Sequence, residues 1–172
     1  MSLVGCRAEG FALQDLSGAT RHLSDLLGRI GILVFWSCEC PHAERLDRSL
    51  PQLMKAWPDD VVVWRIASAA NEPVVALVRR AAELGAAPVL LDSDQAVADS
   101  LGAEVTPHVV VLDRRGIIRY TGAPDDVTLR QRQPTRSYLV EAVTALLRGT
   151  PPNPSEVPGF GCVLTRARPP GN

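Results

Sequence analysis

Short apolar runs alternate with longer amphipathic segments through the middle of the chain. The runs of strand length, rich in β-branched residues, occupy residues 30–35, 61–67 and 89–91. The segments with helical spacing cover residues 41–57, residues 72–84 and the stretch from a Ser93 or Asp94 cap to Leu101. Runs that are apolar throughout indicate strands buried on both faces. The alternation therefore predicts an α/β sheet with helices on both faces.

Shorter elements flank this pattern. Residues 11–18 alternate weakly and, with residues 21–23, predict a short hairpin, followed by one helical turn over 24–27. Residues 109–113 and 117–121 flank an Arg-Arg-Gly turn and predict a pair of antiparallel strands.

Two positions set the expected ends and breaks of helices. Thr135 is the expected cap of a last helix that ends at Gly149, after a polar loop over 125–134. Pro51 stands inside the helical pattern of residues 41–57. Because proline lacks an N–H group, we expect a kink or a break near it.

The composition changes after the last helix. Residues 150–158 are rich in Pro, Asn and Ser and predict an extended linker that leads to Gly161 and Cys162. A chain of 172 residues holds one domain with a sizeable core. We expect a domain over 1–149 and an extension over 150–172. The linker either delivers Cys162 to a specific place or forms only a tail.

The charge balance excludes some classes of function. Lys and Arg number 18 against 19 Asp and Glu, a formal net charge of -1, so no global field favours nucleic acid. No apolar run approaches the roughly 18 residues of a membrane span. No cofactor is indicated, and a homodimer is left open. The compartment is unknown: the chain as given is expected in the cytoplasm, or exported if a native signal was removed.

The chemistry concentrates at the junction between the first buried strand and the first main helix. Cys40 follows residues 30–35 and precedes Pro41, which suits a first helical turn. The unpaired N–H groups and the positive dipole end of a helix favour thiolate over thiol. Cys40 is therefore the candidate nucleophile, and a buried, inert cysteine is the alternative.

The other cysteines have open interpretations. A Cys38–Cys40 bridge would be strained and easily reduced, or Cys38 only fills a loop position. Cys162 is either a resolving thiol or a tail cysteine packed on the surface. Cys6 is expected to be incidental.

Three motifs follow one another along the chain: Gly5-x-x-Ala8-x-x-Phe11, the lead-in Phe35-Trp36-Ser37-x-x-Cys40-Pro41, and Gly161-Cys162. In this order they resemble the redoxin branch of the thioredoxin fold, the alkyl hydroperoxide reductase/thiol-specific antioxidant group. The first is similar to the N-terminal hairpin of that group, the second to the approach to its active cysteine, and the third to the end of a peroxiredoxin-like subgroup. The resemblance implies a thioredoxin-like three-layer fold: a central mixed sheet with helices on both faces, an N-terminal hairpin and an extended C-terminal tail.

The resemblance also implies roles for site residues. Val105-Thr106-Pro107 falls where such proteins carry a cis-proline facing the active cysteine, so Thr106 and Pro107 would present backbone to a substrate. Ser37 fits the hydroxyl position of peroxiredoxins, whereas Leu33 stands at their proline position. Ala43 occupies the place of the second cysteine of thioredoxin-type enzymes. Trp36 and Pro41 belong to the lead-in.

Two further side chains are candidates for tuning the sulfur. His42, as an imidazolium, would lower the pKa of Cys40, or it only fills an exposed helix position. Arg119 lies on a late strand from which it could reach the site. Cys38, Cys40 and His42 are also alternate soft and imidazole ligands, so copper or zinc is a minor alternative, and no metal ligand is assigned.

These observations indicate a thiol-based oxidoreductase with Cys40 as its nucleophile. The expected partners are a disulfide or peroxide substrate and a thiol electron donor. The expected activities are thiol-disulfide exchange and thiol-dependent peroxide reduction. The alternative is a non-catalytic redoxin-fold binding module, for a protein partner or for copper or zinc, that lacks the resolving cysteine.

Overall fold

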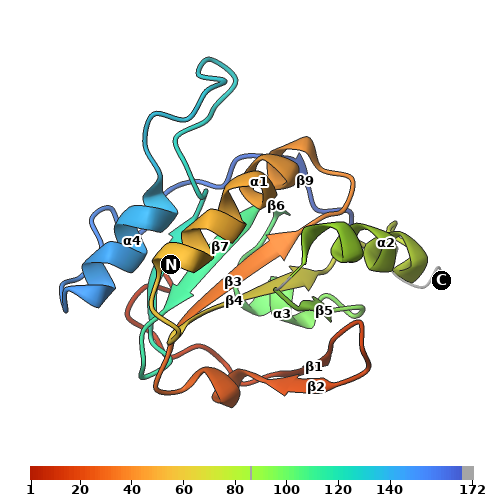
Figure 1. The fold of residues 1–172 in the computed structure, drawn as a ribbon, viewed down its shortest axis with the longest axis horizontal. Coiled ribbons are helices and arrows are strands. Elements are labelled where there is room, and N and C mark those ends of the chain that lie inside the picture. Colours follow the sequence, from red (N-terminus) through yellow and green to blue (C-terminus); the bar gives the residue numbers. More distant parts are fainter. Residues whose placement is uncertain (86, 168–172) are drawn as a thin grey trace.

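A five-stranded mixed sheet forms the centre of the molecule in the computed structural model, which describes residues 1–85 and 87–167. The strand order is β5-β4-β3-β7-β8 (Figure 1). The strands are β3 (Ile30–Trp36), β4 (Val61–Ala67), β5 (Val89–Leu91), β7 (His108–Leu112) and β8 (Ile118–Gly122). β3 pairs parallel with β4 and antiparallel with β7. Every residue of β3 is buried, which explains why its sequence is an unbroken apolar run.

Helices cover both faces of this sheet, as the sequence predicts. The helices are α1 (Pro41–Ala56), α2 (Val74–Leu84), α3 (Ala96–Ser100) and α4 (Tyr138–Leu147), with a 3-10 turn η1 (Leu23–Leu26). Ile32 and Val34 of β3 point into a core shared with α1, α2 and α4. Leu33 and Phe35 point into the opposite core, with α3 and η1. Alternate side chains of β3 therefore pack against the helices on opposite faces of the sheet.

The predicted N-terminal hairpin and the late antiparallel pair are both present. β1 (Ala12–Gln14) pairs antiparallel with β2 (Thr20–His22), and β7 pairs antiparallel with β8. The break that was one of two expectations at Pro51 is absent, because α1 continues through this residue. Leu46 and Leu50 are buried on the inner face of α1, and this packing holds the helix together across the missing N–H group.

The cap of α4 differs from the predicted one, whereas that of α3 agrees in part. The cap of α4 is Ser137, whose hydroxyl accepts a hydrogen bond from the N–H of Val140, whereas Thr135 donates its hydroxyl to Asp126. At α3 the predicted Asp94 accepts the N–H of Ala96 at 3.1 Å, and the buried carboxylate of Asp92 accepts the N–H groups of Val97 and Ala98. Both helices therefore begin later than the sequence indicates.

The C-terminal segment returns to the sheet. After α4 it crosses the end of the molecule that carries the start of α1 (Figure 1). There β9 (Cys162–Val163) pairs antiparallel with β6 (Val105–Thr106). Of the extension expected over 150–172, residues 168–172 lie outside the described part. Within the described residues, no helix has the length and apolar character needed to cross a membrane.

Candidate active site

Cys40 stands where the end of β3 meets the start of α1. It is the N-cap residue of α1, and Pro41 occupies the first helical position. Its carbonyl accepts the N–H of Glu44 at 3.0 Å, which begins the helical hydrogen-bond pattern. The Cys40 side chain is buried, with 4% of its surface exposed. This junction places the sulfur at the positive end of the helix dipole.

The nearest sulfur to Cys40 comes from the other end of the chain. The Sγ atoms of Cys40 and Cys162 lie 2.8 Å apart, although 122 positions separate the two residues in the sequence. Pairing of β6 with β9 sets this position, because Cys162 is directly opposite Thr106 in the register. The Sγ of Cys40 also lies 3.1 Å from the carbonyl oxygen of Thr106. β6 therefore holds Cys162 against Cys40.

The approach of the tail to β6 depends on a glycine. A Cβ atom added to Gly161 would overlap the carbonyl of Thr106 and lie 3.3 Å from Cδ of Pro107. The peptide bond between Thr106 and Pro107 is cis, as the resemblance implies. Any larger residue at position 161 would push the tail away from β6. The Gly-Cys motif thus combines close backbone contact with a sulfur directed at Cys40.

The two sulfurs differ in acidity. Burial raises the pKa of Cys40, but hydrogen bonds from Cys162 and Thr106 and from the N–H of Ala43 outweigh burial, so the pKa is lowered overall. For Cys162, burial, its hydrogen bond to Cys40 and the charge of Cys40 raise the pKa to about 11. The first proton that the pair loses therefore comes from Cys40, and the resulting thiolate accepts a hydrogen bond from the Cys162 thiol. Cys40 is the more acidic thiol of the pair.

His42 does not carry the positive charge that one of the two interpretations of the sequence gives it. Arg45 donates a hydrogen bond to Nδ1 of His42 at 3.0 Å, so this nitrogen must be an unprotonated acceptor. Burial and the charge of Arg45 lower the pKa of His42. Arg45 itself forms an ion pair with Asp125 at 3.1 Å. The imidazole is therefore neutral near pH 7, and its ring packs edge-on against Phe160 of the tail, 5.1 Å between centroids.

Cys38 and Ser37 face a carboxylate. The hydroxyl of Ser37 donates to Oε1 of Glu72 at 2.7 Å, and the N–H of Glu39 donates to the same oxygen at 3.2 Å. Burial and the neighbouring Glu72 raise the pKa of Cys38 to about 12. Cys38 is therefore a protonated thiol near neutral pH, and Ser37 directs its hydroxyl hydrogen at Glu72.

A buried ion pair between Asp47 and Arg65 stabilises the junction between β3 and α1. Trp36 donates its indole N–H to Oδ2 of Asp47 at 2.8 Å, and Arg65 of β4 donates to Oδ1 of Asp47 at 3.0 Å. Arg65 and Asp47 are 1% and 4% exposed. This network ties the last residue of β3 to α1 and to β4, so it fixes the direction in which the chain enters the Cys40 turn.

Two sequence candidates lie elsewhere. Arg119 forms an ion pair with Asp113 at 2.7 Å, at the end of β7 opposite to Pro107, and so it does not reach the sulfurs. Cys6 is exposed and lies outside this group. Pro107, Thr106 and Trp36 do gather around the Cys40 junction. Among the residues that the structure describes, no group of three or more His, Cys, Asp or Glu side chains could hold a metal ion.

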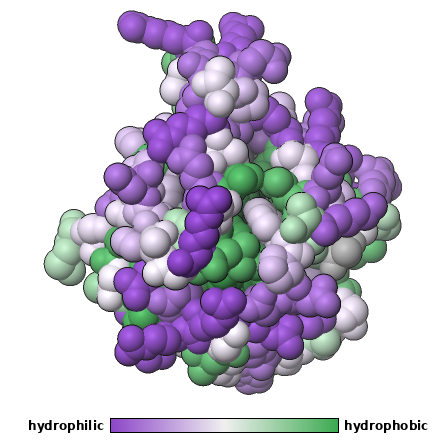
Figure 2. Space-filling model, turned by 60° about the vertical axis from the view of Figure 1, so that its left-hand side comes forward, coloured by the Kyte–Doolittle hydropathy of each residue, from purple (hydrophilic) through white to green (hydrophobic). Residues whose placement is uncertain are grey.

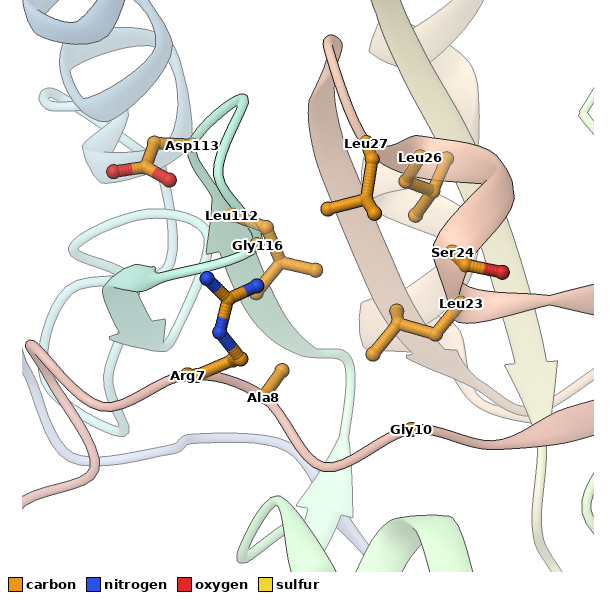
Figure 3. Close-up of a pocket in the computed structure, with 10 residues that line it drawn as sticks. All are labelled: Arg7, Ala8, Gly10, Leu23, Ser24, Leu26, Leu27, Leu112, Asp113 and Gly116. Carbon is orange, nitrogen blue, oxygen red and sulfur yellow. The ribbon is translucent and has the colours of Figure 1, made fainter.

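The sulfur pair opens into a cavity of about 170 Å³. Its lining includes Ser37, Glu39, Thr106 and Thr165 besides the two cysteines. A second cavity, of about 200 Å³, is separate from the sulfur pair. It lies at the other end of β3, where Arg7 and leucine side chains of η1 meet (Figure 3). The face that carries α4 has an apolar hollow beneath a projecting polar segment (Figure 2). The cavity beside the sulfurs is the one that bears on their chemistry.

The charged residues that contact the predicted site residues or their neighbours were not identified from the sequence. Glu72 contacts Ser37, Arg45 contacts His42, and Asp125 pairs with Arg45. These three residues lie in a loop, on a helix face and in a polar stretch, none of which carries a motif. Gly161 belongs to the Gly-Cys motif that the sequence shows, and Phe160 directly precedes it, so a search of the neighbours of this motif finds Phe160. The charged residues become recognisable only once the fold brings them together.

A central mixed sheet between helix layers, with a cysteine at the start of α1 and a cis-proline strand beside it, defines a thioredoxin-like redox protein. The model of the AhpC/TSA family matches residues 4–121, and the chain belongs to this family. A thiol-disulfide oxidoreductase, ResA, of Halalkalibacterium halodurans is 30% identical over 121 residues, 69% of this chain and 67% of that protein.

Solved structures extend the likeness to the C-terminal segment. An uncharacterized conserved protein of Geobacillus kaustophilus is 26% identical with a TM-score of 0.89, and covers 99% of this chain and 95% of its own. A hypothetical protein of Sinorhizobium meliloti is 26% identical with a TM-score of 0.87, at 97% and 96% coverage. A secreted disulfide oxidoreductase of Mycobacterium tuberculosis matches with a TM-score of 0.57 and 26% identity, over 63% of this chain and 79% of its own. These likenesses confirm the predicted thioredoxin-like fold and a thiol-disulfide oxidoreductase type of redoxin.

Proposed function

We propose that this chain is a thiol-disulfide oxidoreductase in which Cys40 is the nucleophile and Cys162 is the resolving cysteine. The observation that carries the proposal is the 2.8 Å separation of the two Sγ atoms. A disulfide bond is about 2.05 Å long, so the two sulfurs need only a small displacement to bond. Cys162 thereby supplies the second sulfur that Ala43 lacks at the usual position.

Reduction of a substrate disulfide would proceed in two exchanges. The Cys40 thiolate attacks one substrate sulfur, forming a mixed disulfide while the substrate S–S bond breaks and its first thiolate leaves. Cys162 loses its proton to solvent and attacks Sγ of Cys40, releasing the second substrate thiolate. Two electrons pass from the cysteine pair to the substrate, and an external thiol donor restores both thiols. In the opposite direction the same steps oxidise a dithiol.

The pKa of Cys162 should fall between the first exchange and the second, which favours the second exchange. The hydrogen bond to Cys40 and its charge contribute to the raised pKa of Cys162. In the mixed disulfide Cys40 carries no charge, so these two contributions disappear and the Cys162 thiol becomes easier to deprotonate. The resolving thiol is thus held back until the first exchange has occurred.

The surroundings of Ser37 favour disulfide over peroxide as substrate. Peroxide reduction would form a sulfenic acid at Cys40 and release an alcohol or water, and Cys162 would then condense with it and expel water. A hydroxyl that assists this step must donate toward the peroxide, whereas Ser37 donates to Glu72. Leu33, which replaces the proline of peroxiredoxins, points away from the sulfur into the opposite core.

Turnover of a small disulfide with a thiol donor tests the proposal. We expect Cys40→Ser to abolish turnover. Cys162→Ser, treated with the disulfide in the absence of the thiol donor, should stop after one mixed disulfide, which a mass shift on Cys40 reports. Cys38→Ser is the matched control and should keep most of the activity. Equal turnover in wild type and Cys40→Ser would refute the proposal. A binding module would show no Cys40-dependent turnover with either a disulfide or hydrogen peroxide.

A further inference from the structure

The segment over residues 155–167, here called the strap, is fastened to the domain on the upstream side of Cys162. Thr121 of β8 donates its N–H to the carbonyl of Ser155 at 3.1 Å and accepts the N–H of Val157 at 3.2 Å. A Cβ atom on Gly122 would overlap the carbonyl of Val157. Backbone pairing and a glycine contact thus seat the strap before it reaches the site.

The strap is fastened again downstream of Cys162. Leu164 is 3% exposed in the core beneath α3, and its N–H donates to the carbonyl of Glu104 at 2.8 Å. Buried Gln95 donates to the carbonyl of Thr165 at 2.9 Å. Arg166 pairs with Asp99 at 2.7 Å. Because both sides are anchored, Cys162 sits on a fixed strand and not on a loose tail.

The fixed strap removes a docking edge. An extended peptide that pairs with a sheet edge needs free backbone N–H and C=O groups. The backbone of β6 at Val105 and Thr106 lies beside Cys40 and already pairs with β9. A polypeptide substrate therefore finds this edge occupied. The cavity of about 170 Å³ beside the sulfurs is the remaining approach, and it has the size of a small molecule.

The charges around this cavity have one sign. Of the described residues that line it, Glu39 is the only acidic or basic one, and the Cys40 thiolate adds a second negative charge. The Glu72 carboxylate lies directly behind, held by Ser37 and by the N–H of Glu39. Its second oxygen, Oε2, is buried with no hydrogen-bond partner within the described part of the chain. Arg45, a basic residue near the site, is already paired with Asp125. The cavity thus repels anions.

From the occupied edge and the acidic cavity we infer the substrate class: small, neutral or cationic disulfides and thiols, with polypeptide disulfides and anionic disulfides excluded. This inference rests on the proposed function. The Cys40 thiolate attacks one sulfur of the small disulfide, the S–S bond of the substrate breaks, and the departing thiolate takes a proton from solvent. Cys162 then displaces the second small thiol, and the cysteine pair is left as a disulfide.

The first exchange can be measured alone in a Cys162→Ser background, because the mixed disulfide then accumulates. Insulin and hydroxyethyl disulfide would be compared, each rate divided by the rate of that disulfide with free cysteine. We expect the normalised rate with insulin to be lower by about a hundredfold, since reaction would require local opening of the strap. The further change Leu164→Ala with Arg166→Ala should unfasten the strap and raise the insulin rate selectively.

Charge selection is measured with cystamine, hydroxyethyl disulfide and dithiodipropionate, a dication, a neutral compound and a dianion. We expect the normalised ratio of cystamine to dithiodipropionate to exceed about tenfold at low salt and to shrink as salt is added. Glu39→Gln should lower this ratio, whereas Glu9→Gln, an exposed carboxylate outside the cavity, should leave it unchanged.

The outcomes separate the two proposals. Insulin reacting as fast as hydroxyethyl disulfide, or dithiodipropionate as fast as cystamine, would overturn the substrate class and leave the proposed function standing. Absence of a mixed disulfide on Cys40 with every probe would overturn the proposed function itself. An insulin rate that stays low after the strap is unfastened would overturn the role of the strap.

Discussion

Gly161 lies so close to Thr106 that a side chain at position 161 would overlap the Thr106 carbonyl. This contact sets how near β9 comes to β6, and with it the place of the Cys162 sulfur. The relationship explains why a glycine precedes this cysteine. It also makes the alignment of the cysteine pair sensitive to a single methyl group.

We expect Gly161→Ala to slow formation of the Cys40–Cys162 bond by at least about tenfold, because a misplaced reacting group loses the benefit of proximity. The measurement is the loss of free thiols with time after addition of an oxidant. Gly10→Ala is the control, since a Cβ atom there meets nothing within 4 Å, and it should oxidise like wild type. Equal rates in the two variants would contradict the role of Gly161.

The acidity of Cys40 should depend on the donor at position 162. Cys162→Ala removes a hydrogen bond that lowers the pKa of Cys40, so the pKa of Cys40 should rise. Cys162→Ser keeps an O–H donor and should change it less. The pH dependence of Cys40 alkylation reports both values in otherwise identical variants. A lower Cys40 pKa in the alanine variant than in the serine variant would contradict the assignment of Cys162 as donor.

The buried pair under the site should dominate the stability of the junction. Asp47→Asn leaves the Arg65 charge buried without its partner, so we expect a loss of about 3–5 kcal/mol in the free energy of unfolding. Urea denaturation measures it. Asp60→Asn breaks the exposed pair with Arg114 and is the matched control, with an expected loss under about 1 kcal/mol. Similar losses in both variants would contradict the prediction, because they would show that burial of the Asp47–Arg65 pair does not increase its effect on the free energy of unfolding.

His108 should make stability depend on pH. Burial lowers its pKa from 6.5 to about 4, so between these values the unfolded chain binds a proton that the folded chain does not. Stability therefore falls as pH drops from about 6.5 to about 4, by roughly 3 kcal/mol for a shift of this size. His108→Gln should remove this contribution. Exposed His22→Gln is the control, and an unchanged pH profile in His108→Gln would contradict the mechanism.

The strands whose ends were predicted correctly are those marked by a local run of apolar residues. β4 begins at Val61 and ends at Ala67, and β5 begins at Val89, all as expected, because β-branched apolar runs mark buried strands. The helix caps were less predictable. Ser93 and Asp94 are the caps that the sequence predicts for α3. Asp94 does accept the N–H of Ala96, but Asp92, which accepts two further N–H groups, is buried by tertiary packing that no local pattern shows.

In the candidate site, too, local sequence pattern predicts some features and tertiary contacts set the others. The junction that presents Cys40 follows from the strand, the proline and the helix stripe around it. The charge state of His42 does not, because it depends on Arg45, and Arg45 pairs with Asp125 from a stretch 80 positions away. The partner of Cys40 is set by a strand pairing across the whole chain, so the sequence left Cys162 open between a resolving thiol and a tail residue.

Disulfide mapping of the protein tests the cysteine pair most directly. The mildly oxidised chain would be alkylated, digested without reductant and examined by mass spectrometry. We expect one linked pair of peptides, carrying Cys40 and Cys162, with Cys38 and Cys6 alkylated. A link between Cys40 and Cys38, or between two chains through Cys40, with Cys162 alkylated, would contradict the pairing on which the proposed function rests.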